Sequence, residues 1–136
     1  FLRTLRAAAA FSLATAAAFA GLYAGLGDLV VALLTDLPAV RAAARAELPW
    51  LAALPLLAVW CFLLDGVFIG ATRTRAMRDT MVLSALGVYL PLWWATRELG
   101  NTGLWLAFDA FFLARGLTLG VALLRQFEGW FPKARD

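Results

Sequence analysis

Four long stretches with almost no charge dominate this sequence and limit what it can fold into. They comprise residues 7–27, 48–72, 80–96 and 103–124, and their only charged side chains are Asp65, Asp109 and Arg115. Each stretch approaches or exceeds the roughly 20 residues that carry a helix across about 30 Å of hydrocarbon. A soluble domain would need a polar face on each helix, and these stretches have none. They therefore predict four membrane spans.

The backbone of these spans is expected to be helical. No alternation of polar and apolar residues with period two runs through them, which excludes a transmembrane β-barrel. The overall composition agrees, with 63% hydrophobic and only 15% charged residues. We expect an all-α, polytopic helical bundle in one domain, with spans at about 7–33, 48–72, 80–96 and 103–124. The third span is the weakest prediction, because it is short and contains Pro91.

Basic residues are distributed unequally between the two ends of the predicted spans. Eight of the twelve Lys and Arg residues belong to one side: Arg3, Arg6, Arg73, Arg75, Arg78, Arg125, Lys133 and Arg135. Three belong to the other side: Arg41, Arg45 and Arg97. The positive-inside rule therefore places both chain ends in the cytoplasm, with Arg73, Arg75 and Arg78 as a topology anchor. Since these cations sit at span ends rather than on one soluble face, we expect no nucleic-acid partner.

Two local features concern the outer connection and the chain start. Residues 35–47 predict a short helix leading into the second span, with Thr35 or Asp36 as its N-cap and Pro38 in its first turn. The first residues also resemble a secretory signal, with Ala-Phe-Ala at 18–20. We favour a span, because the apolar run continues to Leu26 and three more spans follow. Without an initiator Met, we expect the chain to be part of a longer protein.

Glycine pairs at four-residue spacing occur in three of the spans. They are Gly21 with Gly25, Gly66 with Gly70, and Gly116 with Gly120. Such small-xxx-small pairs let two helix backbones approach closely in lipid. We expect them to support helix packing within one bundle, with homodimerisation as the alternative.

Three charged residues lie inside the four apolar stretches, where a charge costs at least a few kcal/mol unless it is paired or hydrated. Asp65 precedes Arg73 by eight residues and Arg115 precedes Arg125 by ten, so they lie about 12 and 15 Å from the same boundary. The matched depths predict an Asp65–Arg115 ion pair, although each could instead face a hydrated cavity. Asp109 is a weaker candidate, because it is on a different face of the helix from Arg115 and nearer to interfacial water.

Asp65 has two interpretations that the residues alone leave open. It could exchange a proton or Na⁺ and so couple transport to an ion gradient, or it could only orient two packed helices. An enzyme is not expected, because the chain has no histidine, a single cysteine (Cys61), and no metal-ligand cluster or phosphate-binding glycine loop. We therefore expect no cofactor and no metal, apart from H⁺ or Na⁺ as a coupling ion.

Several blocks of the sequence resemble a known family. They are VVALLTDLPAVRAAA (30–44), LPLLAVWCFLLDG (54–66), FLLDGVFIGATRTRAMRDT (62–80), LGNTGLWLAF (99–108) and FFLARGLTL (111–119). In order and spacing they resemble the C-terminal part of DinF-type members of the multidrug and toxic compound extrusion (MATE) family. The resemblance implies a bundle of twelve helices in two six-helix lobes, of which the four spans would be helices nine to twelve.

The same resemblance implies a function and partners. The whole protein would be a secondary antiporter of the bacterial inner membrane that exports organic, often cationic or amphipathic compounds in exchange for H⁺ or Na⁺. Its partners would be the lipid bilayer, the first lobe, two further helices of the second lobe and small organic substrates. Asp65 lies on the helix that carries a cation-linked carboxylate in some relatives, whereas others place such carboxylates in the first lobe. The alternative is a self-contained four-span membrane protein with a structural or partner-binding role.

Overall fold

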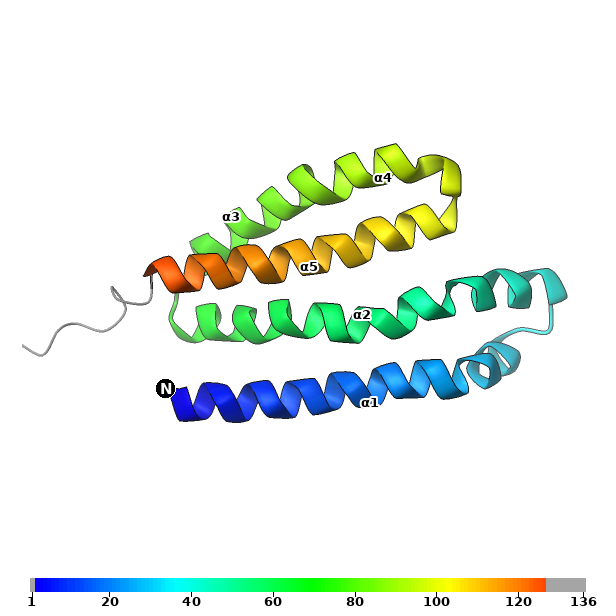
Figure 1. Ribbon diagram of the computed structural model, residues 1–136, viewed down its shortest axis with the longest axis horizontal. Helices are drawn as coiled ribbons and strands as arrows, with labels where there is room; N and C mark the ends of the chain where they lie inside the picture. The colour runs from blue at the N-terminus through cyan, green and yellow to red at the C-terminus, as the bar shows by residue number, and fades with distance from the viewer. Residues whose placement is uncertain (1, 127–136) are drawn as a thin grey trace, which may run out of the picture.

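Residues 2–126, which the computed structural model describes, form one layer of helices lying side by side (Figure 1). The long helices are α1 (Leu2–Leu34), α2 (Pro38–Gly70) and α5 (Asn101–Gln126). A fourth helical segment consists of α3 (Thr74–Ser84), η1 (Ala85–Tyr89), α4 (Leu90–Thr96) and η2 (Arg97–Leu99). Residues 2–126 contain no strand, and the predicted all-α membrane bundle is confirmed.

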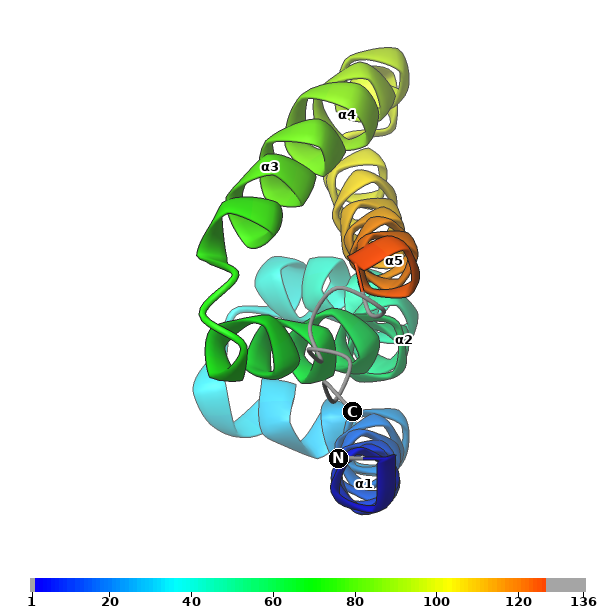
Figure 2. The ribbon, with the colours of Figure 1, turned by 90° about the vertical axis from the view of Figure 1, so that its left-hand side faces the viewer.

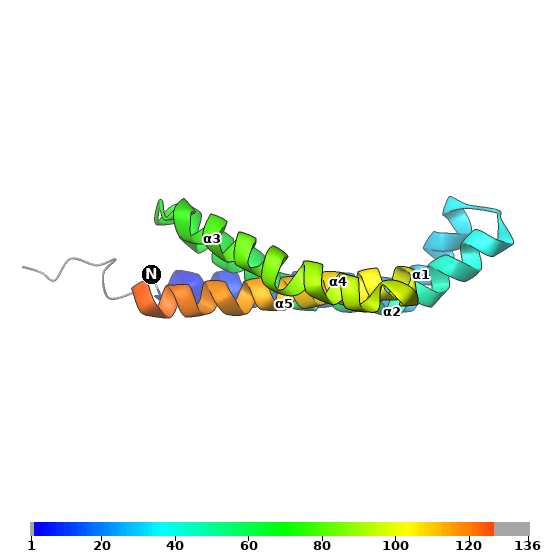
Figure 3. The same cartoon turned by 90° about the horizontal axis from the view of Figure 1, so that it is seen from above.

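Helix α2 lies in the middle of the layer, between α1 and α5. The end-on view of Figure 2 shows α3 and α4 rising at a slant beside α5. Seen from above, in Figure 3, the layer is thin, with α3 turned away from it at one end and the α1–α2 connection bent out at the other. Within residues 2–126, α1 packs against α2 and no other helix.

Three of the helices are long and apolar enough to cross a membrane, namely Arg3–Leu34, Pro38–Gly70 and Asn101–Arg125. They contain the predicted spans 7–33, most of 48–72 and 103–124. Many of their large apolar side chains point outward, such as Leu33 and Leu124, which are 78% and 79% exposed. Outward apolar faces suit contact with lipid or with further helices rather than with water. The chain is a multi-pass membrane protein.

The predicted span 80–96 lies in a segment that runs from α3 through η1 to α4 without a break (Figure 1). Its middle turn is a π-helix, in which the N–H of Leu90 donates to the carbonyl of Ala85, five residues back. Pro91 has no N–H and its ring would collide with the carbonyl four residues before it. A widened turn just before the proline accommodates this ring. Whether the segment crosses the membrane stays a prediction.

The start of α2 differs from the sequence-based prediction in two ways. Leu37 is the N-cap, so the prediction of Thr35 or Asp36 at that position is wrong. Pro38 keeps Leu37 extended, with φ −76° and ψ 115°, and the Thr35 hydroxyl accepts the Leu37 N–H at 3.3 Å. The helix expected within 35–47 and leading into the second span is present, but it is not a short one, because α2 continues through Pro49 and Pro55 to Gly70. Prolines bend this helix instead of ending it (Figure 3).

Arg41, expected only as an outer cation, connects α1 to α2. Its guanidinium donates to the carbonyls of Thr35 and Ala32 at 2.6 and 2.8 Å and pairs with Asp36 at 3.0 Å. These are carbonyls at the end of α1, where a cation is favoured by the helix dipole and by unpaired acceptors. Arg45 adds an exposed ion pair to Asp28 at 3.0 Å.

The turn between α4 and α5 is built on two glycines. Gly100 has φ +62° and ψ −129°, a conformation that residues with a Cβ rarely adopt. Gly103 lies directly against the backbone carbonyl of Thr96, and the Thr96 hydroxyl donates to the carbonyl of Gly103 at 3.2 Å. The two helices therefore meet at backbone distance immediately after the turn.

Exposed arginines gather at one end of the layer. The start of α1, the connection from α2 to α3 with the first part of α3, and the end of α5 all lie at the same end in Figure 1. Those segments carry Arg3, Arg6, Arg73, Arg75, Arg78 and Arg125, all exposed. The grouping of cations by side is thus present in the fold. Lys133 and Arg135 lie outside the described residues.

Candidate functional site

The interface between α2 and α5 holds the most deeply buried part of the described chain. Its centre is formed by Cys61, Phe68 and Leu119, each 0% exposed. Gly116 of α5 faces the backbone of α2, so that an added Cβ would lie 3.4 Å from the Cβ of Trp60 and 3.6 Å from the nitrogen of Cys61. The absence of a side chain at Gly116 lets the helices approach closely.

Two pairs of neighbours fix the relative direction of α2 and α5. Glu47 accepts a hydrogen bond from the Thr102 hydroxyl at 3.0 Å near one end, and Gly116 lies beside Trp60 and Cys61 farther along. From the first pair to the second, the residue number increases along both α2 and α5, so the two helices run parallel. Neighbouring residues on the two helices differ by about 55 in residue number. The parallel register brings the later part of α2, with Asp65, to the level of the later part of α5.

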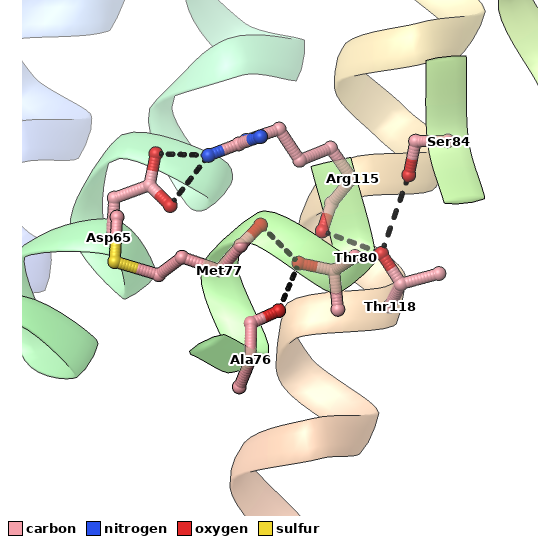
Figure 4. A network of polar contacts seen from close by, with 7 residues as sticks. All are labelled: Asp65, Ala76, Met77, Thr80, Ser84, Arg115 and Thr118. Atoms are coloured by element: carbon pink, nitrogen blue, oxygen red, sulfur yellow. Dashed lines mark hydrogen bonds and ion pairs between the residues drawn. The ribbon is translucent and has the colours of Figure 1, made fainter. Parts of the chain in front are cut away.

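Asp65 and Arg115 form an ion pair across this interface (Figure 4). The Nη2 atom of Arg115 donates to Oδ1 of Asp65 at 2.8 Å and to Oδ2 at 2.9 Å. The side chains are 9% exposed for Arg115 and 17% for Asp65. The partners that the matched depths predicted are therefore together in the structure. The alternative in which each faces a separate hydrated cavity does not describe this conformation.

Burial makes this pair energetically important. Each ion loses hydration worth several kcal/mol on burial, and only its partner compensates. The other terminal nitrogen of Arg115, Nη1, is buried and has no hydrogen-bond partner among the described residues. The guanidinium is therefore incompletely satisfied: Nη2 donates to Asp65, and Nη1 can still donate to another acceptor.

Hydroxyl groups extend the contact from α5 to α3. The Thr118 hydroxyl donates to the carbonyl of Arg115 at 3.0 Å and lies 3.4 Å from the hydroxyl of Ser84 (Figure 4). Thr80, one turn earlier on α3, donates to the carbonyls of Ala76 and Met77. Ser84 and Thr80 are buried, at 1% and 9% exposure. The ion pair thus belongs to a polar region shared by α2, α5 and α3.

Sequence reasoning missed these hydroxyls. Their signal was present, because Thr80, Ser84 and Thr118 lie within the predicted spans. A Ser or Thr inside a helix can satisfy itself on a carbonyl three or four residues back, however, so its presence in a span does not require a partner. Only the packing of α3 on α5 distinguishes Ser84 and Thr118 from other intrahelical hydroxyls.

Asp109 is on α5 but apart from the ion pair. It is 5% exposed, and both carboxyl oxygens are buried without a hydrogen-bond partner among the described residues. The expectation that it reaches interfacial water does not describe this buried position. Asp109 lies seven residues, or about two helical turns, before Gly116, so it is on the face of α5 that packs on α2.

The glycine pairs behave differently from one another. Gly116 packs on α2 as described, and Gly120 has Leu64 Cδ1 4.0 Å from the position of an added Cβ. Around Gly21, Gly25, Gly66 and Gly70, no atom of the described residues lies within 4 Å of such a Cβ. The close approach of α1 to α2 uses Gly27 instead, where an added Cβ would lie 2.8 Å from Leu48 Cδ2.

The arginine cluster begins at Arg73, the N-cap of α3, and continues with Arg75 and Arg78 in the first part of that helix. The turn from α2 to α3 is closed by hydrogen bonds from the backbone N–H groups of Thr72 and Arg73 to the carbonyls of Ile69 and Phe68. Arg78 forms an exposed ion pair with the adjacent Asp79 at 2.7 Å. The cluster is exposed and separate from the buried pair, an arrangement compatible with a role at a membrane surface.

A groove of about 940 Å³ lies between α1 and α2. Its walls are residues of α1 between Thr4 and Tyr23, residues of α2 between Leu51 and Val67, and Phe108 and Phe112 of α5. Within residues 2–126, no group of three or more His, Cys, Asp or Glu side chains could hold a metal ion.

Comparison with known proteins identifies a relative in Escherichia coli. The chain is 41% identical over 128 residues to DNA damage-inducible protein F of Escherichia coli (strain K12), an alignment that covers 93% of this chain. It spans 28% of the length of that protein. No family model matches the chain, and no solved structure matches it. The similarity confirms the resemblance to DinF-type members of the MATE family.

Proposed function

We propose that this DinF-type chain forms part of a secondary antiporter that exports organic compounds in exchange for H⁺ or Na⁺. In this proposal the rest of the transporter supplies the first lobe and two further helices, and Asp65 with Arg115 links cation binding to conformation. The observation that carries it is the ion pair itself, with both oxygens of Asp65 bonded to one buried nitrogen of Arg115.

The pair gives a physical basis for coupling. While Arg115 occupies both oxygens of Asp65, an incoming H⁺ or Na⁺ must compete with a guanidinium that is already in contact. The described conformation therefore has low affinity for the coupling ion. A conformation that separates α2 from α5 would free the carboxylate and raise that affinity. Differential affinity between two conformations is what an ion needs in order to drive a change between them.

Separation of the ion pair would also affect the contact between α5 and α3. Moving Arg115 away from Asp65 displaces α5, and α5 is connected to α3 through Thr118 and Ser84. Cation binding at Asp65 would then change the packing of α2, α5 and α3 together. In that sense Arg115 acts as a built-in competitor for the ion, and not only as a counter-charge.

Replacement of Asp65 by Asn tests the coupling role in the whole transporter reconstituted in liposomes. Asparagine keeps the size of the side chain and removes its charge, so efflux driven by an imposed H⁺ or Na⁺ gradient is expected to fall strongly. The control is Asp79→Asn, which removes the exposed partner of Arg78 and should leave efflux near the wild-type rate. Unchanged gradient-driven efflux in a well-inserted Asp65→Asn protein would reject Asp65 as the coupling site.

We also propose that the arginine-rich end of the layer faces the cytoplasm. Cysteines introduced at Thr72 and Leu37 sample the two ends, since both positions are exposed and lie on opposite connections. In intact cells, a membrane-impermeant maleimide should label Leu37→Cys, whereas Thr72→Cys should react only after permeabilisation. Cys61 is 0% exposed and should remain unlabelled in both. The reverse labelling pattern would contradict the orientation.

A further inference from the structure

Asp109 is buried in a different way from the other acidic residues in the spans. Asp65 has Arg115, whereas neither oxygen of Asp109 has a hydrogen-bond partner among residues 2–126. The residue is only 5% exposed in the described chain alone. Helices elsewhere in a longer protein could cover the outside of α5, but they would find almost no surface of Asp109 left to contact.

Among the charged and titratable groups near this helix, every described cation is engaged elsewhere or exposed. On the elements that pack against α5, and on α5 itself, these groups are Arg41, Arg45, Glu47, Cys61, Asp65, Arg75, Arg78, Asp79, Tyr89, Arg97, Glu98, Arg115 and Arg125. The cations that have partners bind Asp36, Asp28, Asp79, Asp65 and the ring of Trp94. Arg75 and Arg125 are exposed. Thus no described cation neutralises Asp109.

The neighbours of Asp109 along α5 make a charged form less favourable still. Trp105 and Phe112 lie four residues before it and three after it, on the same side of the helix. Both belong to a chain of ring contacts through Phe108, with centroids 6.2 and 4.9 Å apart. An isolated carboxylate among such groups loses its hydration without gaining a counter-charge.

We propose that Asp109 is a proton-binding site that holds its proton in this conformation, separate from the Asp65–Arg115 pair. A bound proton neutralises the carboxyl without any other ligand, whereas a metal cation requires several oxygen ligands, which the described surroundings of Asp109 do not supply. The proposal concerns the protonation of one side chain and does not rest on transport activity.

The proton site and the ion pair occupy different depths on the same interface. Asp109 lies six residues before Arg115 along α5, or about 9 Å, and seven residues after Thr102, or about 10 Å. One carboxyl is neutralised by an arginine and the other by a proton. A change that opens the α2–α5 interface would hydrate Asp109 and release its proton, so this site reports on the opening of the interface.

Infrared spectroscopy of the intact protein in lipid bilayers tests the assignment. With ¹³C-carboxyl aspartate, the wild type at neutral pH should show a C=O stretching band of a protonated, weakly hydrogen-bonded carboxyl. Asp109→Asn should abolish this band and Asp65→Asn should retain it. If Asp109→Asn fails to fold, Asp109→Glu serves instead, because glutamate is unlabelled and the isotope-shifted band should disappear.

The possible results separate the proposal from its rivals. A band that is present in the wild type and absent only from the Asp109 variants supports it. Absence of any protonated aspartate band at neutral pH overturns it, as does a band that persists in Asp109→Asn. Loss of the band on addition of NaCl at constant pH, with KCl as the control, would make Asp109 a sodium site and would also overturn it. None of these readouts depends on whether Asp65 couples efflux.

Discussion

Replacement of Arg115 by Leu is expected to lower the free energy of unfolding by about 3–5 kcal/mol at neutral pH, because it leaves a buried carboxylate without its partner. Asp65 is 17% exposed and both of its oxygens bind the guanidinium that the substitution removes. Asp65→Asn should lower the free energy of unfolding by a similar amount, since the buried guanidinium of Arg115 would remain without its counter-charge. Reversible unfolding of the intact protein in bicelles or nanodiscs measures both losses.

The double variant Asp65→Leu with Arg115→Leu distinguishes a specific pair from two independent packing effects. Replacing both ions by apolar residues is often neutral or stabilising, so we expect the double variant to be more stable than either single variant. The excess over additivity gives the coupling energy of the pair. If the two losses simply add, the ion pair does not stabilise the α2–α5 interface.

At low pH, the losses of unfolding free energy in the two single variants should differ. Without Arg115, the carboxyl of Asp65 can take up a proton and become neutral, so the loss in Arg115→Leu should shrink under acidic conditions. Without Asp65, the guanidinium of Arg115 cannot lose its charge. The loss in Asp65→Asn should therefore persist at the same acidic pH. Equal behaviour of the two variants would show that charge burial is not the source of the loss.

The Asp65–Arg115 pair could be predicted from the sequence because a helix converts residue number into depth. A rise of 1.5 Å per residue fixes how far each residue lies from the basic boundary of its span. Two opposite charges at one depth in an apolar environment have a strong reason to meet. Depth did not reveal which face of each helix is turned toward the other. The packing of Gly116 against Trp60 and Cys61 supplied that information.

Asp109 and the glycines show the limit of the same reasoning. The depth of Asp109 allowed contact with interfacial water, but the close approach of α2 to α5 buries it. Gly21 and Gly25 form a small-residue pair as regular as Gly116 and Gly120, yet only the second pair faces another described helix. A spacing pattern identifies a face that can pack closely, and the neighbouring helix determines whether it does.

The effects of the prolines in α2 and of the glycines in the α4–α5 turn also depend on neighbouring groups. Residues 35–47 predicted a short outer helix, but α2 continues through Pro49 and Pro55, because helices in membranes tolerate proline when neighbouring groups satisfy the freed backbone. The block LGNTG at 99–103 contributed to the family resemblance without a physical explanation. The structure provides one, since Gly100 requires a positive φ and Gly103 requires the absence of a Cβ.

Gly103→Ala is expected to destabilise the protein by about 1–3 kcal/mol, the range for overpacking a site that cannot relax easily. The added Cβ would overlap the backbone carbonyl of Thr96, which is held in the last turn of α4 and cannot rotate away as a flexible side chain could. To remove this overlap, α4 would have to move away from α5, and the hydrogen bond from the Thr96 hydroxyl to the Gly103 carbonyl would be lost.

Gly120→Ala on the same helix is the matched control. Its Cβ would meet Leu64 Cδ1 at 4.0 Å, an ordinary contact, while alanine favours the helix by about 0.5–1 kcal/mol over glycine. Gly120→Ala should thus be neutral or slightly stabilising in the unfolding measurement used for the ion pair. Because both variants make the same chemical change in α5, a difference between them isolates the contact with Thr96. Equal stabilities would mean that α4 can withdraw from α5 at no cost, and the turn would then not hold these helices together.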